Sequence, residues 1–274
     1  MNPINEMVVT YLINVLWMTC VVAAATSLLS RVLLRCPASY RHALWVTALL
    51  CAVLLPLASL RESRSDDKPQ AESAAAASAI QSADTGLSGT SSWALWRRMR
   101  HGGQSVRFGS LFIGIAVLLY LGFIFYRAVR LYCGWQSLRA MLNKSSESQV
   151  PPEMKAVTEQ CYSLLGVKPV PILLSQDGQG PATLGIRNPV LVLPEWFFSQ
   201  ASEDEISCTL SHELAHIRRH DFLLNLGYEI FLLPISFHPA AALIKARIDQ
   251  TRELACDEMA AERLSTRTQY AAPF

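Results

Sequence analysis

Long apolar runs dominate the first half of the chain. Residues 8–29 contain no charged side chain and are long enough to cross a hydrocarbon core of about 30 Å. A second apolar run covers residues 43–60 and a third covers residues 109–126. We therefore predict two transmembrane helices in residues 1–60 and a third transmembrane helix with a helical extension in residues 109–144.

The polar stretches between these runs indicate the topology. Residues 61–108 are rich in Ser, Ala, Asp, Gln and Gly, which predicts a flexible extracytoplasmic loop. Its Trp- and Arg-containing end, residues 93–107, is typical of a helix lying at the membrane surface. Basic residues in the short loop at 30–42 place that loop in the cytoplasm by the positive-inside rule. The arginines in residues 97–107 favour the opposite orientation.

A compact α+β domain is predicted for residues 150–274, after a Ser- and Pro-containing linker at 144–152. Apolar residues at helical spacing predict a helix that ends at Gly166. Short β-type runs follow at 171–174, 182–186 and 190–193, separated by turn residues. The fold class is thus N-terminal transmembrane helices followed by a small, mostly helical domain with a short β-sheet.

The next helix has a defined start. Ser202 and Glu205 form a capping-box pattern, so a helix should begin at this point. Apolar residues then recur at helical spacing and give it a buried face. Within this helix, His212, Glu213 and His216 form the pattern H-E-x-x-H. Residues four apart share one helix face, so both imidazoles can bind one Zn²⁺ ion while Glu213 acts as the general base.

A third metal ligand is needed, and its position bears on a fourth apolar run. Residues 222–244 have the length of a membrane span, but they contain polar residues and two prolines. The best remaining carboxylate is that of Glu253 in the polar helix that follows. If residues 222–244 crossed the membrane, Glu253 would lie on the far side from His212 and His216. Either this run is a hairpin broken near 234–239, or Glu253 is not the ligand.

The amino-acid composition indicates which kinds of molecule the chain is expected to bind. The chain has 274 residues, of which 51% are hydrophobic and 17% are charged, and this balance is typical of a membrane protein. A net charge of +2 is too small to indicate direct nucleic-acid binding. Membrane lipid and a protein or peptide substrate are the expected partners, and a homodimer stays an open alternative. Zinc proteases hold peptides on a sheet edge, for which residues 182–185 are our candidate strand: Ala182, Thr183, Leu184 and Gly185.

The motifs together resemble a known family. His212–His216, the following Asp221, the pair His238–Pro239 and above all residues 252–257 (Arg-Glu-Leu-Ala-Cys-Asp) are similar to membrane metallopeptidases of the BlaR/MecR type, the antirepressor receptors of β-lactam resistance. The resemblance implies a zincin-like domain of the gluzincin class. It also implies that His212, His216 and Glu253 are zinc ligands, that Glu213 is the general base, and that Asp257 lies one helical turn after Glu253. Asp221 is a further candidate for contact with a ligand histidine.

The resemblance implies a multi-pass protein of the bacterial cytoplasmic membrane whose peptidase domain faces the cytoplasm and cleaves a protein such as a transcriptional repressor. Receptors of this type carry an extracellular penicillin-binding sensor, and no such domain is predicted within this sequence. Two alternatives stay open: a quality-control or prenyl-protein type of zinc peptidase, and a non-catalytic signalling protein. The oxyanion-stabilising residue is also open, with three candidates: His238, Arg263 and Tyr270.

Overall fold

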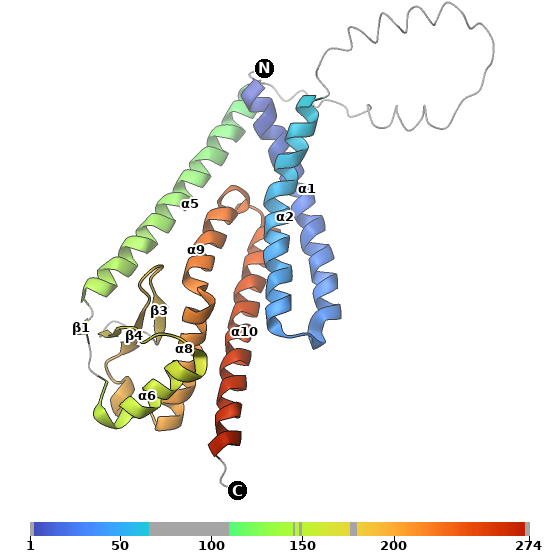
Figure 1. Ribbon diagram of the computed structural model, residues 1–274. Coiled ribbons are helices and arrows are strands. Elements are labelled where there is room, and N and C mark those ends of the chain that lie inside the picture. Colours follow the sequence, from blue (N-terminus) through green and yellow to red (C-terminus); the bar gives the residue numbers. More distant parts are fainter. Residues whose placement is uncertain (1–2, 66–109, 145, 148–149, 176–179, 272–274) are drawn as a thin grey trace, which may run out of the picture. The chain divides into compact units, whose positions relative to one another are not determined.

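Three long helices contain the apolar runs of the first half. The computed structural model describes residues 3–65, 110–144, 146–147, 150–175 and 180–271. Helices α1 (Pro3–Val32), α2 (Ala38–Ser65) and α5 (Ser110–Lys144) are each long and apolar enough to cross a membrane, and the short helix η1 (Leu33–Arg35) precedes α2 (Figure 1). The third helix continues without a break to Lys144, as the pattern predicts. The predicted surface helix at 93–107 lies outside the described residues.

Two compact units can be distinguished in the chain. One comprises Met1–Asn14 with Pro56–Tyr120, and the other comprises Val15–Leu55 with Leu121–Phe274. All the contacts that form the candidate site lie within the second unit. The site can therefore be described from that unit alone.

A small sheet follows the long helices. Helix α6 (Pro152–Leu165) ends at Gly166, whose φ of 61° lies in the left-handed region that glycine tolerates. The sheet has the order β1-β2-β4-β3, with strands β1 (Ser146–Glu147), β2 (Ile172–Ser175), β3 (Ala182–Leu184) and β4 (Val190–Pro194). β2 and β4 are parallel, whereas β3 pairs antiparallel with β4 and forms an edge. Within the predicted linker, residues 146–147 pair with β2.

Helix α8 (Glu203–Arg219) packs across this unit and begins as its sequence predicts. The Ser202 hydroxyl accepts a hydrogen bond from the Glu205 amide, and the Glu205 carboxylate accepts one from the Ser202 amide. The short helix α7 (Phe197–Gln200) precedes it. The buried face of α8 joins α6 and the strands in one apolar core, which includes Leu165, Leu191, Leu193, Ile206, Leu210 and Leu214. This core fixes the helix that carries the H-E-x-x-H motif.

The fourth apolar run forms a helical hairpin. Helix α9 (Asp221–Leu232) is followed by the short helix η2 (Leu233–Ile235), and helix α10 (Pro239–Ala271) then runs back (Figure 1). The break lies where Pro234 and Pro239 interrupt the run, because proline cannot donate a backbone hydrogen bond inside a helix. Of the two alternatives for this run, the structure has the hairpin.

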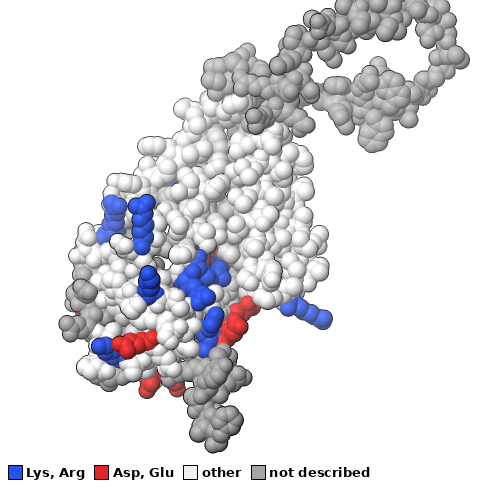
Figure 2. Space-filling model, viewed as in Figure 1, with Lys and Arg blue, Asp and Glu red and all other residues white. Residues whose placement is uncertain are grey.

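The predicted fold class is confirmed: apolar helices that could span a membrane precede a small, mostly helical domain with a short sheet. On the face shown in Figure 2, the coloured charged side chains gather over one part of the surface, and a broad region of the apolar helices is uncharged. An uncharged surface of this extent is compatible with lipid, where a charged side chain would be costly.

Candidate metal centre

Two histidines of α8 face each other across one helical turn. The Nε2 atoms of His212 and His216 are 3.2 Å apart, and their rings are nearly perpendicular. Two nitrogen ligands of a tetrahedral zinc ion would be about 3.3 Å apart, given Zn–N bonds of about 2.0–2.1 Å. The pair therefore has the spacing that a shared zinc ion requires.

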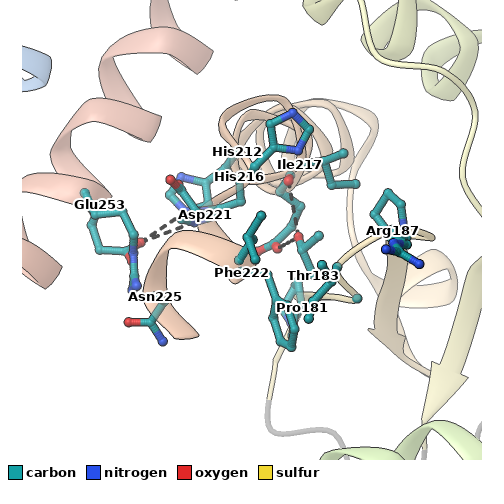
Figure 3. A pocket seen from close by; sticks show the side chains of 18 residues that line it. Pro181, Thr183, Arg187, His212, His216, Ile217, Asp221, Phe222, Asn225 and Glu253 are labelled. Carbon is teal, nitrogen blue, oxygen red and sulfur yellow. Dashed lines mark hydrogen bonds and ion pairs between the residues drawn. The ribbon is translucent and has the colours of Figure 1, made fainter. Parts of the chain in front are cut away.

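Glu253 completes a group of three side chains that could hold a metal ion. Its Oε2 atom lies 3.5 Å from Nε2 of both His212 and His216. The three side chains come from α8 and α10, and Figure 3 shows the carboxylate of Glu253 directed toward the two histidines. Two imidazole nitrogens and one carboxylate oxygen form the ligand set of many catalytic zinc sites, which leave a fourth position open.

Each histidine is also held from behind by a carboxylate. Asp257 Oδ1 lies 2.9 Å from Nδ1 of His212, and Asp221 Oδ2 lies 2.8 Å from Nδ1 of His216. A proton on Nδ1 can be donated to these oxygens, which leaves each Nε2 lone pair free for a metal ion. The sequence proposed both aspartates for this place. The Asp221 side chain is almost fully buried, whereas that of Asp257 is exposed.

These contacts change the pKa values of His212, His216 and Glu253 when no metal ion is bound. The hydrogen bond with Glu253 raises the pKa of His212. Burial opposes the charged form of His216, but hydrogen bonds with Asp221, Cys256 and Glu253 outweigh it and raise the pKa of His216 to about 12. Hydrogen bonds from His212 and His216 hold the pKa of Glu253 far below its usual range. Without a metal ion, the carboxylates thus favour protonated imidazoles, and a bound cation would take the place of these protons.

Arg252 and Cys256 are two members of the site that the sequence did not single out for it. Nε and Nη2 of Arg252 lie 3.1 Å and 2.7 Å from Oε1 of Glu253, so the arginine holds one oxygen and Oε2 faces the histidines. Cys256 is the second of these residues. It is buried, and its Sγ lies 3.3 Å from Nδ1 of His216 and 3.2 Å from Asp221 Oδ2. Their closeness to Glu253 in the sequence was the signal that could have identified them as members of the site.

Glu213 contacts the edge strand. The hydroxyl of Thr183 lies 2.7 Å from Glu213 Oε2 and 3.2 Å from the Glu213 backbone carbonyl oxygen. The four proposed edge-strand residues are placed beside the site, and three of them, with Glu213 and the metal-binding group, line a cavity of about 440 Å³ (Figure 3). Leu184 is instead buried. Gly185, with a φ of 107°, ends the strand in a turn where a Cβ would lie 2.4 Å from the Asn188 carbonyl oxygen.

Of the three proposed oxyanion-stabilising residues, His238 and Arg263 are not among the described residues that line this cavity. His238 is buried elsewhere, where its Nδ1 accepts a hydrogen bond from the Ala240 amide. Arg263 is exposed, and the side chain of Tyr270 lies outside the described part of the chain. The basic side chains in the described cavity lining include those of Arg187, His220 and Arg252.

Comparison with known proteins places this site in a family. The sequence model of the family described as BlaR1 peptidase M56 matches residues 6–273. The chain is 30% identical over 90 residues to the methicillin resistance mecR1 protein of Staphylococcus aureus, and 36% identical over 81 residues to the regulatory protein BlaR1 of Bacillus licheniformis. These alignments cover 33% and 29% of this chain, but only 15% and 13% of the two relatives.

The family match includes all three long apolar helices as well as the H-E-x-x-H helix and Glu253. It agrees with the resemblance found in the sequence motifs. Since it extends over nearly the whole sequence, the chain belongs to the BlaR1 peptidase M56 family.

Proposed function

We propose that this chain is a zinc-dependent endopeptidase of the bacterial cytoplasmic membrane, with its metal centre on the cytoplasmic side. The observation that carries the proposal is the convergence of His212, His216 and Glu253 beside the carboxylate of Glu213. A site needed only for folding has no use for an adjacent general base. When bound, a zinc ion would act as a Lewis acid that polarises the scissile carbonyl and lowers the pKa of a water molecule.

The protein's own groups supply the other parts of peptide hydrolysis. Glu213 opens onto the same cavity as the histidines, so its carboxylate can accept a proton from the attacking water and deliver it to the leaving amine. Strand β3 lies at the sheet edge, and an extended peptide can pair with its free backbone groups. Thr183 donates a hydrogen bond to Glu213 from this strand, so the same element would contact both substrate and base.

The proposed substrate is a cytosolic protein such as a transcriptional repressor. Support comes from the family and from the printed descriptions of the relatives, one as a regulatory protein and one as a methicillin resistance protein. Positive charge in the loop between α1 and α2 supports a cytoplasmic position for the domain. A reporter fused after residue 260 tests this orientation, and an external reporter would contradict it.

The activity is tested with the full chain in detergent micelles. We expect about one zinc ion per chain and metal-dependent cleavage of a fluorogenic peptide library. Glu213→Gln should abolish cleavage while zinc stays bound, because Glu213 is not a ligand. Glu203→Gln, at an exposed acidic position in the first turn of the same helix, is the control. A chain that binds no zinc, or a Glu213→Gln variant that still cleaves, would overturn the proposal.

The quality-control and non-catalytic alternatives predict different results. A quality-control peptidase would cut many unfolded membrane proteins at unrelated sequences. A signalling protein with a structural zinc ion would keep its cellular effect in Glu213→Gln and lose it in His212→Ala.

A further inference from the structure

The first turn of α2 is attached to α10, the helix that carries Glu253. The Ala38 amide donates a hydrogen bond to Glu258 Oε2 at 2.7 Å, and Arg41 Nη2 lies 3.9 Å from Glu258 Oε1. A carboxylate at this position satisfies a free amide at the start of α2 and interacts favourably with the helix dipole. The membrane helix α2 therefore begins on the surface of α10.

One turn into α2, His42 makes a second and buried attachment. Its Nδ1 lies 3.3 Å from the Ile248 carbonyl oxygen and 3.3 Å from Thr251 Oγ1, and its Nε2 lies 3.3 Å from the Tyr228 hydroxyl. The His42 and Tyr228 rings also meet edge to face, and only 8% of His42 is exposed. A neutral imidazole with its proton on Nδ1 satisfies these contacts: Nδ1 donates to the two oxygens of α10, and Nε2 accepts from Tyr228.

These contacts lie on both sides of Glu253 along α10. Thr251 is two residues before Glu253, and Glu258 is five residues after it. Tyr228 belongs to α9, the helix that begins with Asp221, the partner of His216. His42 thus joins the helix of the third metal ligand to the helix that holds the second histidine in place.

We propose that His42 is a positioning residue through which helix α2 sets the location of Glu253 relative to His212 and His216. This inference rests on the proposed function as a zinc peptidase. Helices transmit small displacements as rigid bodies, and a buried polar contact resists sliding because its loss leaves unpaired groups. A displacement of α2 would then move the third ligand and change the zinc affinity of the centre.

The test measures the zinc affinity of the full chain in detergent micelles by competition with a chromophoric chelator. His42→Leu removes the polar contacts of His42 with α9 and α10 and leaves the Ala38–Glu258 hydrogen bond in place. We expect the dissociation constant for zinc to rise about tenfold or more, within the range usual for residues that support metal ligands. His42→Asn keeps a donor near the position of Nδ1 and should restore most of the affinity. Thr47→Val is the control, because Thr47 is exposed on the same helix and its hydroxyl donates to the Ala43 carbonyl oxygen of that helix.

A second variant covers the case in which His42→Leu does not fold. Thr251→Val removes only the hydroxyl that faces His42, and we expect a smaller loss of zinc affinity in the same direction. The unfolding midpoint of each metal-free variant shows whether the loss merely follows a loss of fold.

The outcomes separate the two proposals. If the unchanged chain binds no zinc, the proposed function fails and this inference fails with it. If the unchanged chain binds zinc and neither His42→Leu nor Thr251→Val weakens binding more than Thr47→Val does, the positioning role alone is overturned.

Discussion

Thr183 is the edge-strand residue that contacts Glu213, the proposed general base. Its hydroxyl lies 2.7 Å from Glu213 Oε2. A hydrogen bond to a charged group contributes about 1.5–3 kcal/mol, or roughly 10- to 100-fold in rate where it acts in the transition state. We predict that Thr183→Val lowers kcat by about this factor with zinc still bound, whereas Thr183→Ser, which keeps the hydroxyl, stays near the unchanged activity. Steady-state kinetics on one peptide check this, and equal losses in both variants would contradict it.

Arg252 acts on Glu253 in a comparable way. Two of its nitrogens contact Oε1, which leaves Oε2 as the single oxygen that faces His212 and His216. Without the two Arg252 nitrogens, the Glu253 carboxylate is free to rotate. Arg252→Met should therefore raise the zinc dissociation constant about 10-fold or more. Arg247→Met is the control, because Arg247 is exposed on α10 and contacts Gln250. Chelator competition measures both, and equal affinities would show that Arg252 does not orient the ligand.

Helical spacing predicted that His212 and His216 share one face, and the family resemblance supplied Glu253 and Asp257, whose contacts with these histidines cross from α10 to α8. His212 and His216 are one turn apart on one helix, and Asp257 is one turn from Glu253 on another. Arg252 and Cys256 lie among the same motif residues, but their contacts depend on how α10 rotates against α8. A hydrogen-bond partner across two helices has no signature in helical periodicity, and a buried cysteine looks like any small apolar core residue.

At the scale of elements, the start of α8 fixes where the motif helix begins. Ser202 and Glu205 exchange two hydrogen bonds with each other's backbone. We predict that Ser202→Ala lowers the free energy of unfolding by about 1 kcal/mol, as loss of an N-cap usually does. Ser199→Ala is the control, since the Ser199 hydroxyl is exposed and bonds only the Trp196 carbonyl. Denaturant unfolding at neutral pH compares them, and equal midpoints would contradict the role of the cap.

The same cap gives stability a dependence on acid. Hydrogen bonds from the Ser202 backbone and side chain lower the pKa of Glu205 from its ordinary value of 4.5. A group whose pKa is lowered on folding stabilises the fold above its unfolded value and loses that contribution as the pH falls through its folded value. The difference in free energy of unfolding between the unchanged chain and Ser202→Ala should therefore shrink as the pH falls below about 4.5.

The fourth apolar run shows what element length alone cannot decide. Residues 222–244 match a span in length and apolar character, yet α9 ends at Leu232 and the chain reverses before Pro239. The requirement that one metal have three ligands favoured the hairpin, because a span would have separated Glu253 from α8. No such requirement predicted strand β1. Its two residues lie in a Ser-rich segment and are a strand only because they pair with β2.

At the scale of the whole molecule, the metal centre joins segments that are far apart in the chain. The proposed ligands come from α8 and α10, the carboxylates that contact the two histidines come from α9 and α10, and the proposed general base is contacted by β3. These groups come together where α9 and α10 pack against α8. Zinc binding should therefore be coupled to folding of this entire unit and to the protonation of its ligands.

Zinc and protons compete for the imidazole nitrogens, so the zinc affinity should depend on pH. In the metal-free chain the pKa of His212 is raised by Glu253, and that of His216 is raised to about 12, whereas the pKa of Glu253 is lowered. At about pH 7–8 zinc must therefore displace at least one proton from the imidazoles and none from the carboxylate. We predict that the logarithm of the zinc association constant rises by about one for each pH unit in this range. A histidine with an ordinary pKa of about 6.5 would give little slope there.

Calorimetry in two buffers of different ionisation enthalpy counts the protons released when zinc binds. Asp221→Asn supplies the matched comparison, because it replaces the carboxylate that favours the charged form of His216 with a neutral amide. That variant should release fewer protons and show a shallower slope, even though its affinity also falls. A zinc affinity that stays constant between about pH 7 and 8.5 in the unchanged chain would mean that the imidazoles are already unprotonated before the metal arrives. The surrounding carboxylates would then raise the pKa values of the two imidazoles less than we infer.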